Sequence, residues 1–191
     1  MKNLYVLLII IISGFFFYSC NESPSVSPDN LSNKSATTIL SKASGPSASG
    51  QGVIDRIHGY QRIITFSATT HPDGSVSGSG QLIKVSSDLN SRQHIKFDID
   101  CLNVNGNTAI MSGTITMVIK NNIQDPAQQL IMAGWLFQFK VVDNGEGANA
   151  VPDQITYFAN WAPDDPNAAT CGEDVGWDLF DIEAGNVQVK Q

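Results

Sequence analysis

Few side chains in this 191-residue sequence have the types and spacing that catalysis requires. A nucleophilic Ser or Cys needs a nearby His and a carboxylate. The three histidines are His58, His71 and His94. His71 lies beside a turn signal and His94 on the polar side of an alternating segment, so we expect both at the surface. Asp98 and Asp100 could act as paired carboxylates. They share their side of the segment with a lysine, which favours a solvated row of charges.

The carboxy-terminal third is acidic and could offer ligands to a hard cation. No Lys or Arg occurs between Val141 and Val189, whereas ten Asp or Glu do. Calcium takes about six to eight oxygen ligands from such loops. The candidate ligands are Asp143, Glu146, Asp153, Asp164 and Asp165. Their spacing matches no EF-hand, and a solvated acidic surface is the favoured interpretation. We expect no cofactor, with calcium as the alternative.

Three aromatic residues, Tyr157, Trp161 and Trp177, are the best candidates for ligand contacts. Aromatic rings stack on sugars and line apolar pockets. Trp161 and Trp177 lie near the acidic loops. Trp135 instead falls on the apolar side of a strand-like segment, which predicts that it packs in the core.

The first nineteen residues are predicted to be a targeting segment. Lys2 supplies a positive start, and residues 4–17 are almost entirely apolar. A transmembrane helix would need about 20 apolar residues, and Ser19 ends the run too early. Residues 17–20, Phe-Tyr-Ser-Cys, resemble the lipobox of bacterial lipoproteins, in which the cysteine is acylated and becomes the new amino terminus. The resemblance implies a signal peptide over residues 1–19, lipidation of Cys20, for example by palmitate, and attachment to a membrane through acyl chains.

An exported chain with a lipidated Cys20 has two further cysteines, Cys101 and Cys171. Two cysteines in an oxidising compartment usually pair, so we predict a disulfide between them. The expected location is the cell envelope, at the outer membrane or cell surface, facing the periplasm or the exterior.

Charge excludes two classes of partner. Lys2 is the only charged residue of the first nineteen, so the chain from Cys20 carries 10 Lys or Arg against 18 Asp or Glu, a balance of −8. Binding of nucleic acid requires a basic surface, and recruitment to anionic lipid by charge requires the same. We therefore expect the N-terminal lipid alone to hold the protein at the membrane.

The remaining chain divides into a linker and one domain. Residues 20–50 contain the lipidated cysteine and a Ser- and Pro-rich segment without aromatic residues, which predicts a flexible tether spanning about 30 Å. Residues 51–191 show the period-2 alternation of β-strands between turn signals. The expected strands are 52–58, 61–71, 75–86, 92–104, 108–120, 131–142, 154–161 and 185–190. Their number and spacing predict a single antiparallel up-and-down β-barrel or sandwich of about eight strands.

Two hairpins can be predicted to the level of register, because a slip of one residue would turn an apolar face toward water. A three-residue loop over 72–74 makes the apolar faces of the first hairpin coincide. It pairs Ile64 with Leu82, Phe66 with Gly80 and Ala68 with Gly78. In the second hairpin, a three-residue loop over 105–107 is favoured on the same ground. It pairs Cys101 with Met111, Ile99 with Gly113 and Phe97 with Ile115.

Three blocks of sequence resemble a group of exported bacterial proteins. They are residues 101–109 (CLNVNGNTA), residues 141–154 (VVDNGEGANA and PDQ) and residues 183–189 (EAGNVQV). Those proteins are small all-β domains without assigned function, and the similarity covers about residues 60–191. The resemblance implies the domain boundary and carries no functional residue with it.

These observations favour a membrane-anchored extracytoplasmic lipoprotein whose domain is a non-catalytic binding or surface-interaction module rather than an enzyme. The ligand would be a small molecule, a glycan or a protein. The alternatives are a small-barrel enzyme of the isomerase type and a calcium-dependent glycan-binding domain. Whether inward-facing residues fill the barrel or leave a hole decides among them.

Overall fold

The computed structural model describes residues 45–191, except residues 58, 125–128 and 148–149. The described residues fall within one compact unit, residues 40–191. The predicted targeting segment, Cys20 and His58 lie outside the described residues. None of the described residues belongs to a helix that is long and apolar enough to cross a membrane.

In the part of the chain that the structure describes, ten strands form one antiparallel sheet. They are β1 (Ser47–Ile57), β2 (Tyr60–Thr70), β3 (Val76–Ser86), β4 (Arg92–Asn105), β5 (Thr108–Asn121), β6 (Leu136–Val142), β7 (Gln154–Thr156), β8 (Ala159–Trp161), β9 (Leu179–Asp181) and β10 (Ala184–Lys190). The first strand begins at Ser47, so it includes the last four residues of the expected linker.

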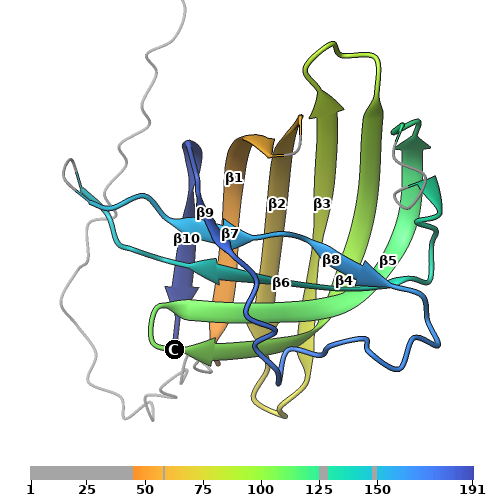
Figure 1. Ribbon diagram of the computed structural model, residues 1–191. Coiled ribbons are helices and arrows are strands. Elements are labelled where there is room, and N and C mark those ends of the chain that lie inside the picture. Colours follow the sequence, from red (N-terminus) through yellow and green to blue (C-terminus); the bar gives the residue numbers. More distant parts are fainter. Residues whose placement is uncertain (1–44, 58, 125–128, 148–149) are drawn as a thin grey trace, which may run out of the picture. The chain divides into compact units, whose positions relative to one another are not determined.

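The sheet follows an up-and-down path and curls into a half-barrel. Strands β1 to β6 pair in sequence order, β7 and β8 both pair with β6, β9 pairs with β7, and β10 returns to pair with β1 at the other edge. Figure 1 shows that β4 and β5 bend strongly, so that the two ends of each strand lie on different sides of the half-barrel. The all-β, antiparallel prediction is confirmed. The sheet has more strands than expected, because residues 154–161 form two short strands and residues 179–181 add another.

Register shifts and glycines permit the bend. The pairing of β4 with β5 shifts at three places, between His94 and Ile95, between Lys96 and Phe97, and between Ile99 and Cys101. Such bulges increase local twist and bend the strands that carry them. Gly80 lies beneath the Phe97 ring, and a Cβ at this position would come within 2.5 Å of that ring. The close approach of the ring therefore requires a glycine in β3.

The β2–β3 hairpin has the predicted register. Ile64 faces Leu82, Phe66 faces Gly80 and Ala68 faces Gly78. The amide of His71 donates to the Ser75 carbonyl at 2.7 Å, which closes the three-residue loop over 72–74. Gly74 adopts a φ of 85°, the left-handed conformation that this loop requires.

The β4–β5 hairpin differs from the prediction near its turn. Asn105 pairs with Thr108, so the loop has two residues, and Cys101 faces Ser112 rather than Met111. A bulge at Asp100 then shifts the register by one residue. Beyond the bulge, Ile99 faces Gly113 and Phe97 faces Ile115, as predicted. The apolar faces coincide because the bulge compensates for the shorter loop.

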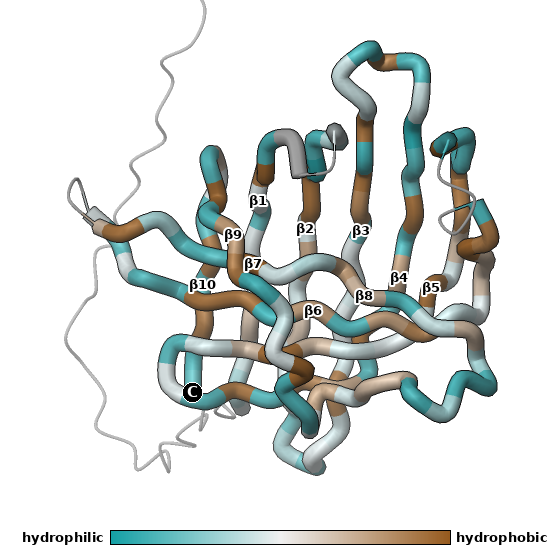
Figure 2. The backbone as a smooth tube through the Cα atoms, in the orientation of Figure 1, coloured by the Kyte–Doolittle hydropathy of each residue, from teal (hydrophilic) through white to brown (hydrophobic). Residues whose placement is uncertain are grey.

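The apolar residues that alternate along the strands form a core on the concave side of the sheet. Figure 2 shows this alternation along β3 and β4. The centre of the core is a cluster of phenylalanine rings: Phe97 lies 4.7 Å from Phe137 and 5.0 Å from Phe158 between ring centroids. Trp135 packs against this core, as predicted. It lies just before β6, because the strand expected over residues 131–142 begins only at Leu136. The rings fill one part of the half-barrel and leave a cavity beside them.

Candidate ligand-binding pocket

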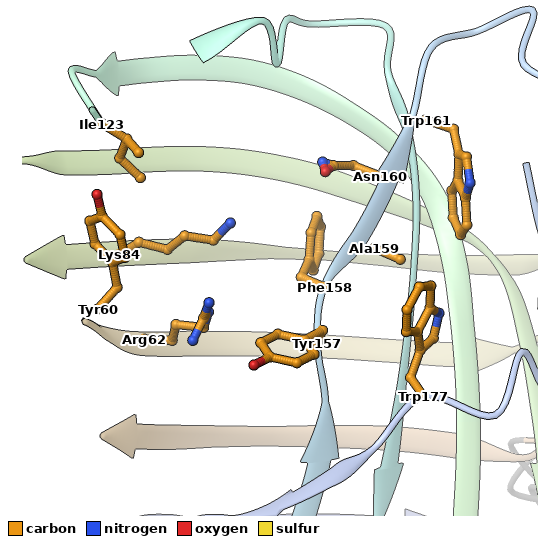
Figure 3. Close-up of a pocket in the computed structure, with 10 residues that line it drawn as sticks. All are labelled: Tyr60, Arg62, Lys84, Ile123, Tyr157, Phe158, Ala159, Asn160, Trp161 and Trp177. Carbon is orange, nitrogen blue, oxygen red and sulfur yellow. The ribbon is translucent and has the colours of Figure 1, made fainter. Parts of the chain in front are cut away.

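A half-open pocket of about 580 Å³ lies beside the phenylalanine cluster. Its volume is within the range of about 300–1,000 Å³ that small-ligand sites occupy. One wall is formed by the sheet, through Tyr60 and Arg62 of β2 and Lys84 of β3, together with Ile123. The segment from Tyr157 to Trp161 and the side chain of Trp177 form the facing wall. Figure 3 shows the nitrogen ends of Arg62 and Lys84 directed toward the Tyr157–Phe158 segment.

Two buried cations define the sheet wall. Arg62 and Lys84 are direct cross-strand neighbours, and their side chains point to the same face as Ile64 and Leu82. Arg62 is 8% exposed and Lys84 is 5% exposed. Lys84 is also opposite the fully buried Gln93 on β4. A polar row therefore crosses the concave side of the sheet next to its apolar core.

Tyr157 connects this wall to the facing one. The Arg62 guanidinium carbon lies 4.9 Å from the centroid of the Tyr157 ring, which is cation–π distance. Burial lowers the pKa of Arg62 from its usual value. Burial also raises the pKa of Tyr157, an effect that Asp178 reinforces and Arg62 opposes. The Tyr157 phenol therefore keeps its proton at neutral pH, whereas the guanidinium remains charged.

A break between β7 and β8 places Tyr157 and Phe158 in the pocket wall. The Thr156 hydroxyl accepts a hydrogen bond from the Lys140 amide at 2.9 Å and donates to the Tyr157 carbonyl at 3.0 Å, so it satisfies backbone groups where the strand pairing stops. Phe158 stacks on Phe137 with 4.7 Å between centroids and 13° between ring planes. The facing wall of the pocket is thus continuous with the core through Phe158.

The loop that carries Trp177 is attached to the sheet at several points. The predicted disulfide between Cys101 and Cys171 is present, with 5.7 Å between the Cα atoms. The Cys171 amide donates to the Ser112 hydroxyl at 3.1 Å. Further along, Lys140 forms a salt bridge with Asp174 at 2.8 Å. These contacts attach the segment between β8 and β9, which contains no strand, to the sheet. Trp177 lies within this segment.

The structure brings together the three aromatic residues that the sequence singled out. Tyr157, Trp161 and Trp177 all line the pocket. Arg62 and Lys84, which also line the pocket, are not among the residues predicted from the sequence. A signal for them exists, because Arg62 continues the apolar alternation of Ile64 and Phe66 toward the start of its strand. A charged residue at an inward position is unusual and often functional.

The five candidate metal ligands are not gathered around one point. Among the described residues, no group of three or more His, Cys, Asp or Glu side chains is arranged to hold a metal ion. Asp165 accepts hydrogen bonds from the amide and side chain of Asn167, Glu146 accepts one from Asn186, and Asp164 is exposed. These three acidic side chains therefore do not share a common site.

Asp143 and Asp153 bind the backbone of the edge strand β10. Asp153, which is buried, accepts hydrogen bonds from the amides of Val187 at 2.7 Å and Asn144 at 2.8 Å. Asp143 accepts one from the amide of Val189 at 2.9 Å. The amides of Val187 and Val189 lie on the edge of β10 that does not pair with β1. The two carboxylates thus take the place of a neighbouring strand and protect this edge.

The remaining chemical candidates lie away from the pocket. His71 is hydrogen-bonded to the Ser77 hydroxyl at 2.6 Å beside the β2–β3 turn. His94 is hydrogen-bonded to Gln81 at 3.1 Å, and burial, together with nearby cationic residues, lowers its pKa. Asp98 and Asp100 are exposed, and Asp100 lies in the bulge of β4. None of these four residues lines the pocket.

The geometry defines a β half-barrel with an aromatic and cationic pocket on its concave side. Comparison of the sequence with protein-family models and with curated proteins gives no match, and no solved structure matches the chain. The interpretation of the pocket therefore rests on its own residues.

Proposed function

We propose that this protein is an extracytoplasmic lipoprotein, held at the cell envelope by acyl chains on Cys20, whose β domain binds a small organic molecule in the pocket between Lys84 and Trp177. The domain acts as a binding module rather than as an enzyme. The convergence of Tyr157, Trp161 and Trp177 on one cavity is the observation that carries this proposal.

The composition of the pocket supports binding rather than catalysis. Among the described residues, those that line it include no serine, cysteine, histidine or carboxylate. A serine or cysteine nucleophile paired with a histidine base is therefore not available among these residues. Aromatic rings with a few polar groups are what binding sites for small organic molecules use to hold and orient a ligand.

The exposure of Trp177 supports an open site. Its side chain is 44% exposed although it lines a concave surface and its loop is anchored. A ligand that enters the pocket would cover this ring and gain apolar contact area. The anchored loop means that little ordering of the wall is needed on binding, which favours affinity.

The test uses a neutral fluorescent probe, N-phenyl-1-naphthylamine, with the soluble chain from residue 21 to residue 191. This chain retains all ten strands and the disulfide. We expect saturable binding of one probe, weakened about three- to tenfold by Trp177→Ala because a stacked ring is lost.

Met132→Ala is the matched control. Met132 is 61% exposed and lies outside the pocket, so its loss should leave the affinity unchanged. Binding that does not saturate, or that responds to Met132→Ala as much as to Trp177→Ala, would mean that the probe adheres to exposed apolar surface instead.

A further inference from the structure

We infer that the ligand of this pocket is a glycan, with a sugar ring packed against the indoles of Trp161 and Trp177 and its hydroxyl groups bonded to the side-chain amide of Asn160. The inference rests on the proposed function and names the class of ligand that the pocket binds. A glycan combines apolar ring faces with neutral hydroxyl groups, and the pocket offers a complement for each.

The two indole rings provide apolar surface that the protein leaves partly uncovered. Trp161 belongs to β8 and is half-buried, whereas Trp177 lies between β8 and β9 and is 44% exposed. Both line the pocket, and neither ring stacks on another aromatic ring among the described residues. A sugar ring that covers them would gain contact area, because the C–H groups on a sugar face are apolar.

Asn160 places a neutral polar group on the core side of the same pocket. In the pairing of β8 with β6, Asn160 is opposite Phe137, which is fully buried. Its amide points into the pocket (Figure 3). In the part of the chain that the structure describes, no side chain or backbone group forms a hydrogen bond with this amide. An amide both donates and accepts, as sugar hydroxyls do, so neighbouring hydroxyls of one ring match it.

The free edge of β8 adds further neutral groups. Strand alternation directs Asn160 to one side of β8 and Trp161 to the other, yet both line one cavity. The cavity therefore passes along the edge of β8 that faces away from β6. This edge has no strand partner among the described residues. Backbone N–H and C=O groups at such an edge are available to the hydroxyls of a ligand.

These groups favour a glycan over the other ligand classes. The two cations of the pocket wall, Arg62 and Lys84, already interact with other groups of the protein, so the polar groups left for a ligand are neutral. A purely apolar ligand would cover the Asn160 amide without giving it a partner, which is unfavourable. An extended peptide could pair with β8, but a strand of three residues offers few backbone bonds to an added strand.

The experiment applies the chain 21–191 to a printed array of bacterial, plant and animal oligosaccharides and, in parallel, to an array of random peptides. We expect saturable binding to a defined group of oligosaccharides and none to the peptides. The oligosaccharide that binds most tightly, free in solution, should displace N-phenyl-1-naphthylamine, because both occupy the same pocket. Trp177→Ala should weaken the binding of both.

Asn160→Leu tests the amide. It should weaken binding of that oligosaccharide about three- to tenfold, because hydrogen bonds to the ligand are lost. It should leave the affinity for N-phenyl-1-naphthylamine, which has no hydroxyl group, nearly unchanged. The melting temperature should not fall, because the amide has no hydrogen bond to the described residues. Asn103→Leu is the matched control, because Asn103 is exposed on β4 and does not line this pocket.

The outcomes separate the inference from the proposed function. Binding of N-phenyl-1-naphthylamine that Trp177→Ala weakens, with no oligosaccharide bound or with binding to the peptides instead, would overturn the glycan inference and leave the pocket standing. Glycan binding that Trp177→Ala does not weaken, or that Asn160→Leu and Asn103→Leu weaken equally, would place the glycan elsewhere and also overturn the inference. Failure of the probe and of every oligosaccharide to bind would overturn the proposed function.

Discussion

Arg62 lies over the face of Tyr157, with 4.9 Å between the guanidinium carbon and the ring centroid. Arg62 belongs to β2, and Tyr157 lies in the break between β7 and β8, nearly a hundred residues later in the chain. The contact therefore joins the two walls of the pocket. Tyr157 also packs edge-on against Phe180 at 4.7 Å, so its ring is held from both sides.

Replacement of the Tyr157 ring should show what this contact contributes to stability. Tyr157→Leu is expected to lower the free energy of unfolding by about 0.5–2 kcal/mol relative to Tyr157→Phe, because only phenylalanine keeps a ring beneath the guanidinium. Urea titration of both variants measures the difference. Equal stability of the two would show that the contact is not energetically significant.

Loss of the Cys101–Cys171 disulfide should affect both stability and the pocket. The bridge spans 70 residues, and the chain-entropy model gives an upper contribution of about 4 kcal/mol for a loop of this length. Reduction should lower the unfolding free energy by up to this amount. It should also weaken binding of N-phenyl-1-naphthylamine, because the bridge anchors the loop that carries Trp177.

The control for the disulfide is a double variant, Cys101→Ser with Cys171→Ser, whose stability a reductant should not change. Thiol titration of the denatured, unreduced chain 21–191 gives a direct count. No free thiol is expected, and two free thiols in protein from the cell envelope would contradict the bridge.

Local alternation was sufficient to predict the β2–β3 hairpin but not the whole of β4–β5. In the first hairpin, only one loop length brings the apolar faces together. In the second, a three-residue loop and a two-residue loop with a bulge at Asp100 both place Ile99 opposite Gly113. Burial cannot separate these solutions, because they differ only near the turn. The partner of Cys101 was therefore predicted wrongly, whereas the register of the core was predicted correctly.

The candidate site was predictable in part. Residue type and proximity to the acidic loops pointed to Trp161 and Trp177. Arg62 and Lys84 were missed because they lie near the ends of β2 and β3. At a strand end, the sequence pattern does not show whether a polar residue still points inward. The meeting of the β7–β8 segment with β2 and β3 depends on the curvature of the half-barrel, which local sequence patterns do not specify.

Asp153 is expected to stabilise the fold by accepting a backbone hydrogen bond at the free edge of β10. Asp153→Ala leaves the amides of Asn144 and Val187 without their acceptor and should cost about 1–3 kcal/mol. Hydrogen exchange of the Val187 amide should accelerate in this variant. Asp164→Ala is the control, because Asp164 is exposed and should tolerate the change. Equal losses for the two variants would contradict the role assigned to Asp153.

Asp88 should contribute to stability in a way that depends on pH. The Ser86 hydroxyl, followed by the side chain and amide of Asn90, lowers the pKa of Asp88 to about 2. A carboxyl with a lowered pKa stabilises the folded state fully above its unfolded pKa, about 4. This contribution is lost as pH falls from about 4 through 2. The stability difference between wild type and Asp88→Asn should therefore shrink over this interval, and a constant difference would contradict the assignment.

Membrane attachment through Cys20 has its own test. The wild-type protein should sediment with membranes and incorporate labelled palmitate when expressed in a bacterium that acylates lipoproteins. Cys20→Ala should lose the label and be processed aberrantly or released, because no acyl chain then anchors it. Unchanged sedimentation of the Cys20→Ala protein would contradict lipid anchoring. Cys101→Ser, which leaves the signal segment intact, serves as the control.

The most direct test of the pocket uses the three tryptophans of the chain, Trp135, Trp161 and Trp177, each of which gives one indole N–H signal in a proton–nitrogen NMR spectrum. Titration of the chain 21–191 with 8-anilinonaphthalene-1-sulfonate should shift the signals of Trp161 and Trp177 along one saturable curve. The signal of Trp135, which lies outside the pocket, should change little. Equal shifts of all three signals, or a shift confined to Trp135, would contradict a ligand site in this pocket.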